Sequence, residues 1–279
     1  MQSGALPFFL ESIMETTIFQ LNNVYLEKKQ KTGITQILSD INFSVNDGEF
    51  ICVMGPTGCG KSSLMRLLGS TETPSSGSVL FLGKNTNAEK AIDKSILRQV
   101  GTAFQSDNLS EWKTVEKNMQ LPIDIFGLKN MLDVSSQTEK MLKLTGLVNY
   151  KNCYPRELSG GMRQRCAFGR ALIHNPKILL LDQPFGALDA ITRKILGIEL
   201  LKIWKKQKKT IVMITNSVPE ALMLGQRILV MSSAPGNITH EVINHIPYEK
   251  RFEDLGDNEK YKLLAEKLNT YVHEKKRYS

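Results

Sequence analysis

The sequence predicts an α/β fold built around a mainly parallel sheet. Three apolar runs support this prediction, at residues 50–54 (FICVM), 178–181 (ILLL) and 210–215 (TIVMIT). Runs without polar alternation are typical of strands that are buried on both faces, as strands of parallel sheets are. Helical patterns separate the runs, and a chain of 279 residues can bury a large core around them.

A glycine-rich loop follows the first of these strands and precedes a helix predicted over residues 61–68, with Gly69 as its cap. The loop and helix start read GPTGCGKS, which matches G-x-x-x-x-G-K-S. Glycines let backbone amides turn towards phosphate oxygens, and the helix N-terminus favours the same charge. Lys61 supplies a cation for the β- and γ-phosphates, and Ser62 offers a hydroxyl to Mg²⁺. The predicted ATP-binding residues here are Gly55, Pro56, Thr57, Gly58, Cys59, Gly60, Lys61, Ser62 and Ser63.

The second strand ends in Asp182, whose carboxylate could reach a metal ion. An ATP-hydrolysing site would be expected to place another carboxylate next, to orient or deprotonate water. Gln183 occupies that position, and an amide has no ionisable group that could accept the proton. The sequence therefore predicts nucleotide binding more firmly than hydrolysis.

A helix is predicted before the third strand. Leu196, Leu200 and Ile203 recur on it at spacings of four and three, and Ile195 and Ile198 widen the stripe. We interpret this stripe as core packing.

The chain is predicted to hold one main domain with two appended parts. Residues 15–246 form the ATP-binding domain, and residues of about 106–158 read as an inserted helical subdomain with a helix near 137–144. The charged tail, 247–279, carries a predicted helix from Asn258 to His273. We interpret residues 1–14 as an unordered extension or an upstream start before Met14. No apolar run approaches the roughly 20 residues that span a bilayer.

The net charge of +8 is concentrated in residues 205–209 (KKQKK) and in the tail at 275–277 (KKR). A basic balance can indicate nucleic acid or an anionic membrane surface, although cations also suit helix C-termini. Aromatic residues do not interleave with these lysines, so nucleic-acid binding is not expected. The four cysteines lack metal-ligand spacing and are interpreted as reduced thiols of a cytosolic protein: Cys52, Cys59, Cys153 and Cys166.

A second motif reveals a family resemblance. Residues 157–172 (ELSGGMRQRCAFGRAL) resemble the signature motif of ATP-binding-cassette (ABC) ATPases. The resemblance implies a P-loop NTPase core with a mainly parallel sheet, an antiparallel β part and an inserted helical subdomain. It also implies that Ser159, Gly160 and Gly161 contact the γ-phosphate of a nucleotide held by another subunit. A small-residue helix N-terminus would permit that close approach.

Further positions match the family pattern. Tyr25 resembles the aromatic residue that stacks on adenine, although a core tyrosine is the alternative. Gln105 resembles the glutamine that contacts Mg²⁺ or the attacking water and links the core to the helical subdomain. Asp182 resembles the Mg²⁺-linked aspartate, and Asp189, in the segment expected along a dimer seam, is implied as a nucleotide-binding residue. The implied metal-site residues are Ser62, Gln105 and Asp182, and the implied cofactors are ATP and Mg²⁺.

A closer resemblance spans roughly residues 17–245. The stretches QPFGALDAITRKILGIELLKIW and ITNSVPEALMLGQRILVMSSAPGNI are similar to the ATPases of importers for nitrate, sulfonate and taurine. This resemblance implies a peripheral protein on the cytoplasmic face of the cell membrane. Its implied partners are a second ABC ATPase subunit in a homodimer or heterodimer, a membrane permease and, indirectly, a substrate-binding protein. The alternative is a non-transport regulator that uses the cassette as an ATP-dependent clamp.

The predicted catalytic residues are Gln183, Asn216 and Gln105, and the sequence departs from the family pattern at the first two. Family members normally have Glu at the first and His at the second. Loss of a general base typically lowers a rate by about 10² to 10⁴. We therefore expect retained ATP binding with weakened hydrolysis, and leave open whether the two substitutions are natural or engineered.

Overall fold

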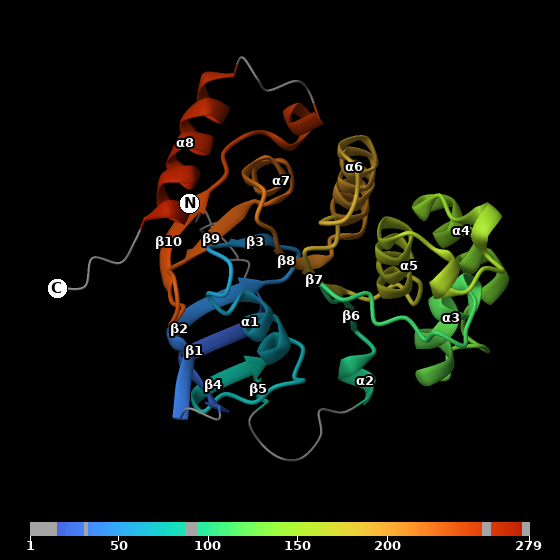
Figure 1. Ribbon diagram of the computed structural model, residues 1–279, viewed down its shortest axis with the longest axis horizontal. Coiled ribbons are helices and arrows are strands. Elements are labelled where there is room, and N and C mark those ends of the chain that lie inside the picture. Colours follow the sequence, from blue (N-terminus) through green and yellow to red (C-terminus); the bar gives the residue numbers. More distant parts are fainter. Residues whose placement is uncertain (1–15, 31–32, 87–93, 253–257, 275–279) are drawn as a thin grey trace, which may run out of the picture.

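The computed structural model describes residues 16–30, 33–86, 94–252 and 258–274 (Figure 1). Its larger sheet has the strand order β10-β9-β3-β8-β7-β6. Five of these strands run parallel, and β10 (Ile238–Ile243) is antiparallel to β9 (Arg227–Met231). The others are β3 (Phe50–Met54), β8 (Thr210–Ile214), β7 (Ile178–Asp182) and β6 (Val100–Ala103). The predicted α/β class with a mainly parallel sheet is confirmed.

The antiparallel part is a separate four-stranded sheet in the order β2-β1-β4-β5. The two long strands β1 (Thr17–Gln30) and β2 (Gly33–Asn46) pair along most of their length. Two shorter strands, β4 (Ser76–Phe81) and β5 (Lys84–Asn85), complete the sheet. Helix α1 (Lys61–Leu68) packs its apolar side chains into the core that this sheet shares with the parallel sheet.

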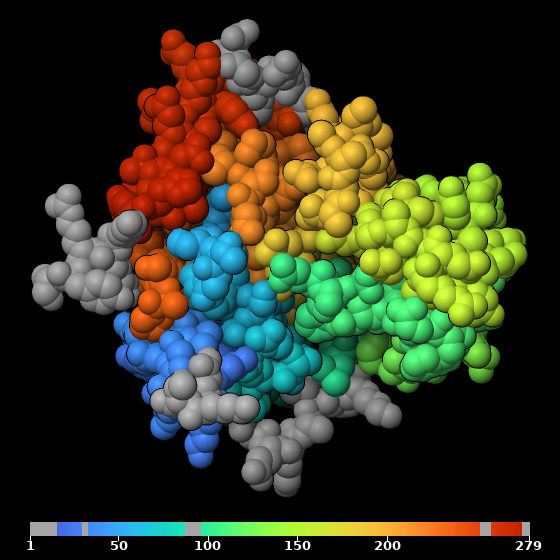
Figure 2. Space-filling model, in the orientation of Figure 1, coloured from blue at the N-terminus to red at the C-terminus, as the bar shows by residue number. Residues whose placement is uncertain are grey.

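A group of helices lies beside the parallel sheet, where it forms a lobe on the right of Figure 2. Its members are α3 (Val115–Ile125), α4 (Val134–Thr145) and α5 (Gly160–Leu172), and both α3 and α4 pack against α5. The short 3₁₀ helices η1 (Val148–Tyr150) and η2 (Pro155–Glu157) connect α4 to α5. The subdomain boundary at residues 106–158 and the division of the chain into domains stay predictions.

The remaining helices follow the strands. They are α2 (Lys94–Leu97), α6 (Ala190–Gln207), α7 (Val218–Leu224), η3 (Tyr248–Phe252) and the tail helix α8 (Glu259–His273). The expected extension, residues 1–14, and the basic end at 275–277 lie outside the described residues.

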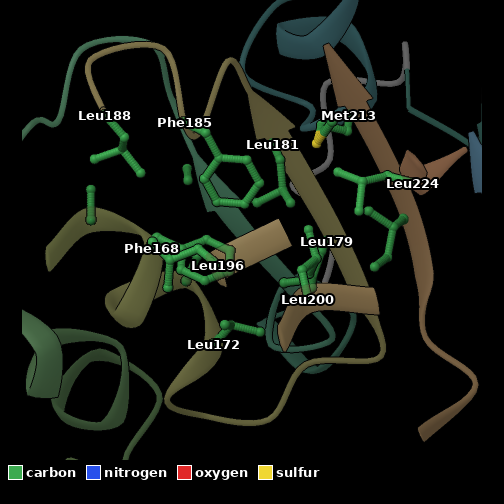
Figure 3. Packing of buried hydrophobic residues seen from close by; sticks show 14 of the residues in the cluster. Phe168, Leu172, Leu179, Leu181, Phe185, Leu188, Leu196, Leu200, Met213 and Leu224 are labelled. Atoms are coloured by element: carbon green, nitrogen blue, oxygen red, sulfur yellow. The ribbon is translucent and has the colours of Figure 1, made fainter. Parts of the chain in front are cut away.

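Two apolar cores lie on the opposite faces of the parallel sheet. Alternate residues of each central strand enter different cores: in β7, Leu179 and Leu181 face one core, and Ile178 and Leu180 face the other. Figure 3 shows the first core, in which Phe168 of α5 and Leu200 of α6 lie around Leu179 and Leu181. Burial on both faces explains the uninterrupted apolar runs in the sequence.

The apolar stripe of α6 is core packing only in part. Leu196 and Leu200 are buried and Ile203 is partly buried, as predicted. Ile195, however, is 54% exposed, so its assignment to the core was wrong. The spacing of apolar residues identifies a helix face, but it does not give the width of the part that neighbouring elements cover.

Leu200→Ala should lower the free energy of unfolding by about 2–5 kcal/mol, because it opens a cavity in a fully buried region. Ile195→Ala, on the same helix, should change it by no more than about 0.5 kcal/mol. Urea denaturation followed by circular dichroism measures both. Similar losses in the two variants would contradict the packing of α6 described above.

Candidate nucleotide site

The loop between β3 and α1 needs glycine where its backbone adopts positive φ angles and neighbouring strands approach closely. Gly55 and Gly60 have φ angles of 154° and 101°, which side-chain-bearing residues rarely adopt. A Cβ atom on Gly55 would lie 2.8 Å from the Met231 carbonyl oxygen, and one on Gly60 would lie 2.6 Å from Leu38 Cδ2. The neighbouring strands therefore hold this loop in one tight path.

Lys61 is the first residue of α1 and directly follows the loop. Its side chain is only 5% exposed, and Nζ donates to the carbonyl oxygens of Gly55 at 2.7 Å and Pro56 at 2.8 Å. Gly60 caps α1 without a side-chain acceptor, so it leaves the positive helix N-terminus open to an anion. Ser63, by contrast, accepts a hydrogen bond from Arg66 at 2.9 Å and is buried.

The three predicted metal-site residues come together. Ser62, Gln105 and Asp182 line one cavity of about 600 Å³, although they come from α1, the loop after β6 and the end of β7. Asp182 is 2% exposed, and its Oδ1 has no hydrogen-bond partner among the described residues. Burial raises the pKa of the Asp182 carboxyl, while the Ser62 hydroxyl and the Lys61 cation act in the opposite direction. A buried carboxylate oxygen without a partner, next to a hydroxyl, fits a hard cation such as Mg²⁺.

The two positions that depart from the family pattern are in contact. Asn216 Nδ2 donates to Gln183 Oε1 at 3.4 Å, so the two substitutions form one neutral amide pair. Gln183 has a left-handed φ of 49°, and its backbone amide donates to the Ile214 carbonyl at 3.0 Å. The backbone conformation thus fixes the position of the Gln183 Cα atom, from which the side chain extends.

Gln164 of α5 is a site residue that the sequence analysis missed. Its Nε2 donates to the Gln183 carbonyl at 3.0 Å, and its Oε1 accepts from the Ala187 amide at 2.8 Å. Both groups belong to the turn that follows β7. Its position one helical turn before Phe168 indicates that Gln164 could face the core, where a buried amide needs partners, but the sequence does not identify those partners.

Two arginines of α5 were also missed. Arg163 Nε lies 2.9 Å from Asp107 Oδ2, and Arg170 donates to the carbonyl oxygens of Asp107 and Asn108 at 2.7 Å and 2.8 Å. These contacts hold the loop that follows Gln105. Helix α5 therefore contacts both the Gln183 turn and the Gln105 loop.

The remaining predicted residues are not among the described residues that line this cavity. Ser159 caps α5 by accepting from the Met162 amide at 3.3 Å, and Gly160 and Gly161 form the first turn. Asp189 caps α6 by accepting from the Thr192 amide at 2.9 Å. Tyr25 is a half-buried residue of β1 and is not among the described residues that line the cavity.

The tail helix borders a second cavity, of about 490 Å³, beside the phosphate-binding loop. Gly55, Pro56, Thr57 and Asn216 line it together with the last turn of α8. His240 of β10 holds this turn, since its ring stacks on Tyr271 with centroids 3.6 Å apart. The sequence predicted the helix but gave no indication of where it would pack.

A glycine-rich loop before a helix, a buried cation and a buried carboxylate at the ends of parallel strands define a nucleotide-binding P-loop protein. Comparisons with known proteins identify the family. The family model described as "ABC transporter" matches residues 38–186. The chain belongs to this family.

Three relatives agree with the predicted resemblance to importer ATPases. A nitrate import ATP-binding protein of Synechocystis is 39% identical over 259 residues, covering 91% of this chain and 90% of its own. An aliphatic sulfonates import ATP-binding protein of Bacillus cereus is 37% identical over 82% of this chain and 87% of its own. A taurine import ATP-binding protein of Pelagibacter ubique is 37% identical over 85% and 83%. The predicted resemblance is confirmed.

A solved structure shares the fold. It is a dimeric ATP-binding cassette in a post-hydrolysis state bound to ADP and phosphate, with a TM-score of 0.73 and 30% identity. The match covers 82% of this chain and 100% of that cassette.

Asp182→Asn should raise the melting temperature of the nucleotide-free protein at neutral pH. The raised pKa means that the folded state holds the proton more tightly than the unfolded state does. Stability therefore falls as the pH rises from the unfolded pKa through the folded one, and the amide avoids that loss. The variant should also lose the part of the ATP-induced shift that requires Mg²⁺.

Differential scanning fluorimetry with and without Mg²⁺ and ATP measures both effects. Asp189→Asn is the matched control, because the Thr192 backbone amide lowers the pKa of that exposed carboxyl. It should give no stability gain and should keep the Mg²⁺ response. A destabilised Asp182→Asn protein with an unchanged Mg²⁺ response would contradict the metal assignment.

Proposed function

We propose that this chain is the ATP-binding subunit of an ABC importer and that it binds MgATP but hydrolyses it slowly. The observation that carries the proposal is the combination of an intact binding set with a neutral amide pair. The binding set consists of Lys61, which contacts the glycine-rich loop, and of Ser62 and Asp182, which line the cavity. The amide pair is the contact between Gln183 and Asn216, at the positions where the family has Glu and His.

The binding residues have separate roles in this proposal. Bound MgATP supplies the phosphoanhydride bond whose cleavage drives a transport cycle. When ATP binds, Lys61 Nζ would leave the carbonyl oxygens of Gly55 and Pro56 and bind phosphate oxygens instead. Its positive charge would then neutralise part of the phosphate charge. Ser62 and Asp182 would hold the metal, and Gln105 from the same cavity would offer a further oxygen.

The amide pair changes the chemistry more than the geometry. A carboxylate at Gln183 could accept a proton from water, whereas an amide can only orient it. Asn216 can donate a hydrogen bond to a phosphate oxygen, but it adds no positive charge. Positioning and electrostatic stabilisation by the loop and the metal site survive, so slow turnover is expected rather than none.

Gln183→Glu should raise the rate of phosphate release partially, and Gln183→Glu with Asn216→His should raise it further. Restoring a general base is worth about 10² to 10⁴ in rate, but groups that act as a unit are not additive. The measurement is steady-state phosphate release at saturating MgATP by wild type and both variants.

Lys61→Ala controls for contaminating ATPases, and it should also lose most of the ATP-induced rise in melting temperature. A wild-type rate equal to that of the double variant would mean that another group supplies the base. A double variant that binds ATP and dimerises without hydrolysing it would place the block outside this pair.

The importer assignment is supported by the names of the relatives, which are import proteins for nitrate, aliphatic sulfonates and taurine. All three are small anions or zwitterions that carry an oxyanion group. None of the described helices is long and apolar enough to cross a membrane. The names of the relatives support a membrane permease as partner. We place this chain on the cytoplasmic face of the cell membrane, with a second cassette, identical or different, that supplies the opposing signature motif. A substrate-binding protein is the indirect partner. No observation favours the alternative of a regulatory clamp.

The helical group α3–α5 is the proposed docking surface for the permease. The segment that contains this group exposes several large apolar residues, of which the most exposed are Trp112 at 77%, Met131 at 63% and Ile125 at 61%. Exposed apolar residues of this kind are typical of an interaction surface.

Trp112→Glu with Ile125→Glu should weaken capture of a detergent-solubilised permease by roughly tenfold or more. Each large apolar side chain is worth about 1.5–3 kcal/mol when buried, and about 1.4 kcal/mol is a factor of ten in affinity. Ile34→Glu is the matched control, because Ile34 is 65% exposed but belongs to the antiparallel sheet. Unchanged capture by the first variant, or crosslinks from this lobe only to soluble proteins, would favour the regulator.

A further inference from the structure

A third cavity, of about 280 Å³, lies between α4, α6 and the start of β8. None of the residues that line it lines the two cavities near the phosphate-binding loop. In Figure 1, α6 stands beside the helical group that contains α4. The cavity is therefore at the junction between the helical group and the sheet core.

The lining is strongly cationic. The lining residues include four lysines, Lys140, Lys202, Lys206 and Lys209, and one acidic residue, Glu199. Glu199 already pairs with Lys202, whose Nζ lies 2.7 Å from Oε1. Within the described part of the chain, Lys140 and Lys206 form no ion pair. The cavity thus holds more positive charge than its own residues neutralise.

Lys209 is the buried member of this set. It is 4% exposed, and Nζ donates to Asn175 Oδ1 at 2.9 Å and to the Pro176 carbonyl oxygen. Both partners are neutral. Burial lowers the pKa of Lys209 to about 8, and the nearby Lys140 cation acts in the same direction. A buried cation without a counter-ion is costly, and an anion in the cavity would remove much of that cost.

Helix-end stabilisation does not account for the whole arrangement. Cations near the last turn of α6 favour the negative end of the helix, which explains Lys206. Lys140 belongs to another helix and Lys209 directly precedes β8, yet both line the same cavity. Lysines from three separate segments thus line one small space, as expected for anion recognition.

We propose that the cavity between α4 and α6 binds a small divalent oxyanion of the phosphate or sulfate class. Its volume is at the lower end of small-molecule sites, which suits a compact ligand. The ammonium groups of Lys140 and Lys206 bind the anion from opposite sides, and the buried Lys209 supplies charge from beneath. The anion joins α4 of the helical group to α6 and β8 of the sheet core. The site and its test are independent of transport and of ATP hydrolysis.

The test is isothermal titration calorimetry of the full chain, with sodium sulfate and inorganic phosphate titrated separately. The ionic strength is kept constant in a low-chloride buffer. All proteins carry Lys61→Ala, because the phosphate-binding loop is a rival anion site. One anion should bind per chain. Lys140→Gln with Lys206→Gln should weaken binding at least about tenfold, since each removes a charge-assisted hydrogen bond.

Lys194→Gln is the matched control, because Lys194 is an exposed α6 lysine that does not line the cavity. It should keep the parent affinity, and melting temperatures should show that all variants are folded. Sodium nitrate tests the charge class and should bind more weakly than sulfate. Absence of saturable binding, equal weakening by Lys194→Gln, or tighter binding of nitrate than of sulfate would overturn the proposal.

Discussion

The parallel register of the central strands is the constraint on which the candidate site depends. Strands β3, β8, β7 and β6 are neighbours that run in one direction, so their carboxyl ends meet at one edge of the sheet. Each end carries part of the site: the glycine loop after β3, Asn216 after β8, Asp182 on β7 and Gln105 after β6. Because the strands are buried on both faces, a shift in their pairing would disrupt both cores together with the site.

Helix α5 adds a second layer of organisation to this edge. Its N-terminus presents Ser159 to solvent, while Gln164 holds the turn that contains Gln183. Arg163 and Arg170 hold the loop after Gln105. A movement of α5 would therefore displace the amide position and the metal-site loop together. The helical group is thus mechanically connected to the nucleotide site through hydrogen bonds rather than through apolar packing alone.

Features that depend on local sequence were predictable, and features that depend on distant contacts were not. The strand–loop–helix unit from Phe50 to Leu68 was predicted with its bounds, because glycine turns, a buried strand and a helix cap are written within one short segment. Ser62 was predicted as a metal-site residue from the loop motif, Asp182 from the strand end and Gln105 from the family resemblance, and the structure brings all three to one cavity. The exposure of Ile195, the Gln164 contacts and the position of α8 escaped prediction. Each depends on elements that lie elsewhere in the chain, and the residue pattern of a single helix does not predict which elements it will contact.

The contact between Gln183 and Asn216 changes how the two substitutions are understood. Considered separately, each removes one ionisable group; in the structure they share a hydrogen bond and form one neutral unit. The backbone at Gln183 is fixed by the Ile214 carbonyl and by Gln164, so a carboxylate there would start from the same place. The amide pair therefore differs from the family pattern in charge and proton affinity, whereas the surrounding backbone that positions the two side chains is the same. Under the proposed function, a frame that keeps Lys61, Ser62 and Asp182 retains the groups that would hold MgATP, and the step that needs a base is the one expected to slow.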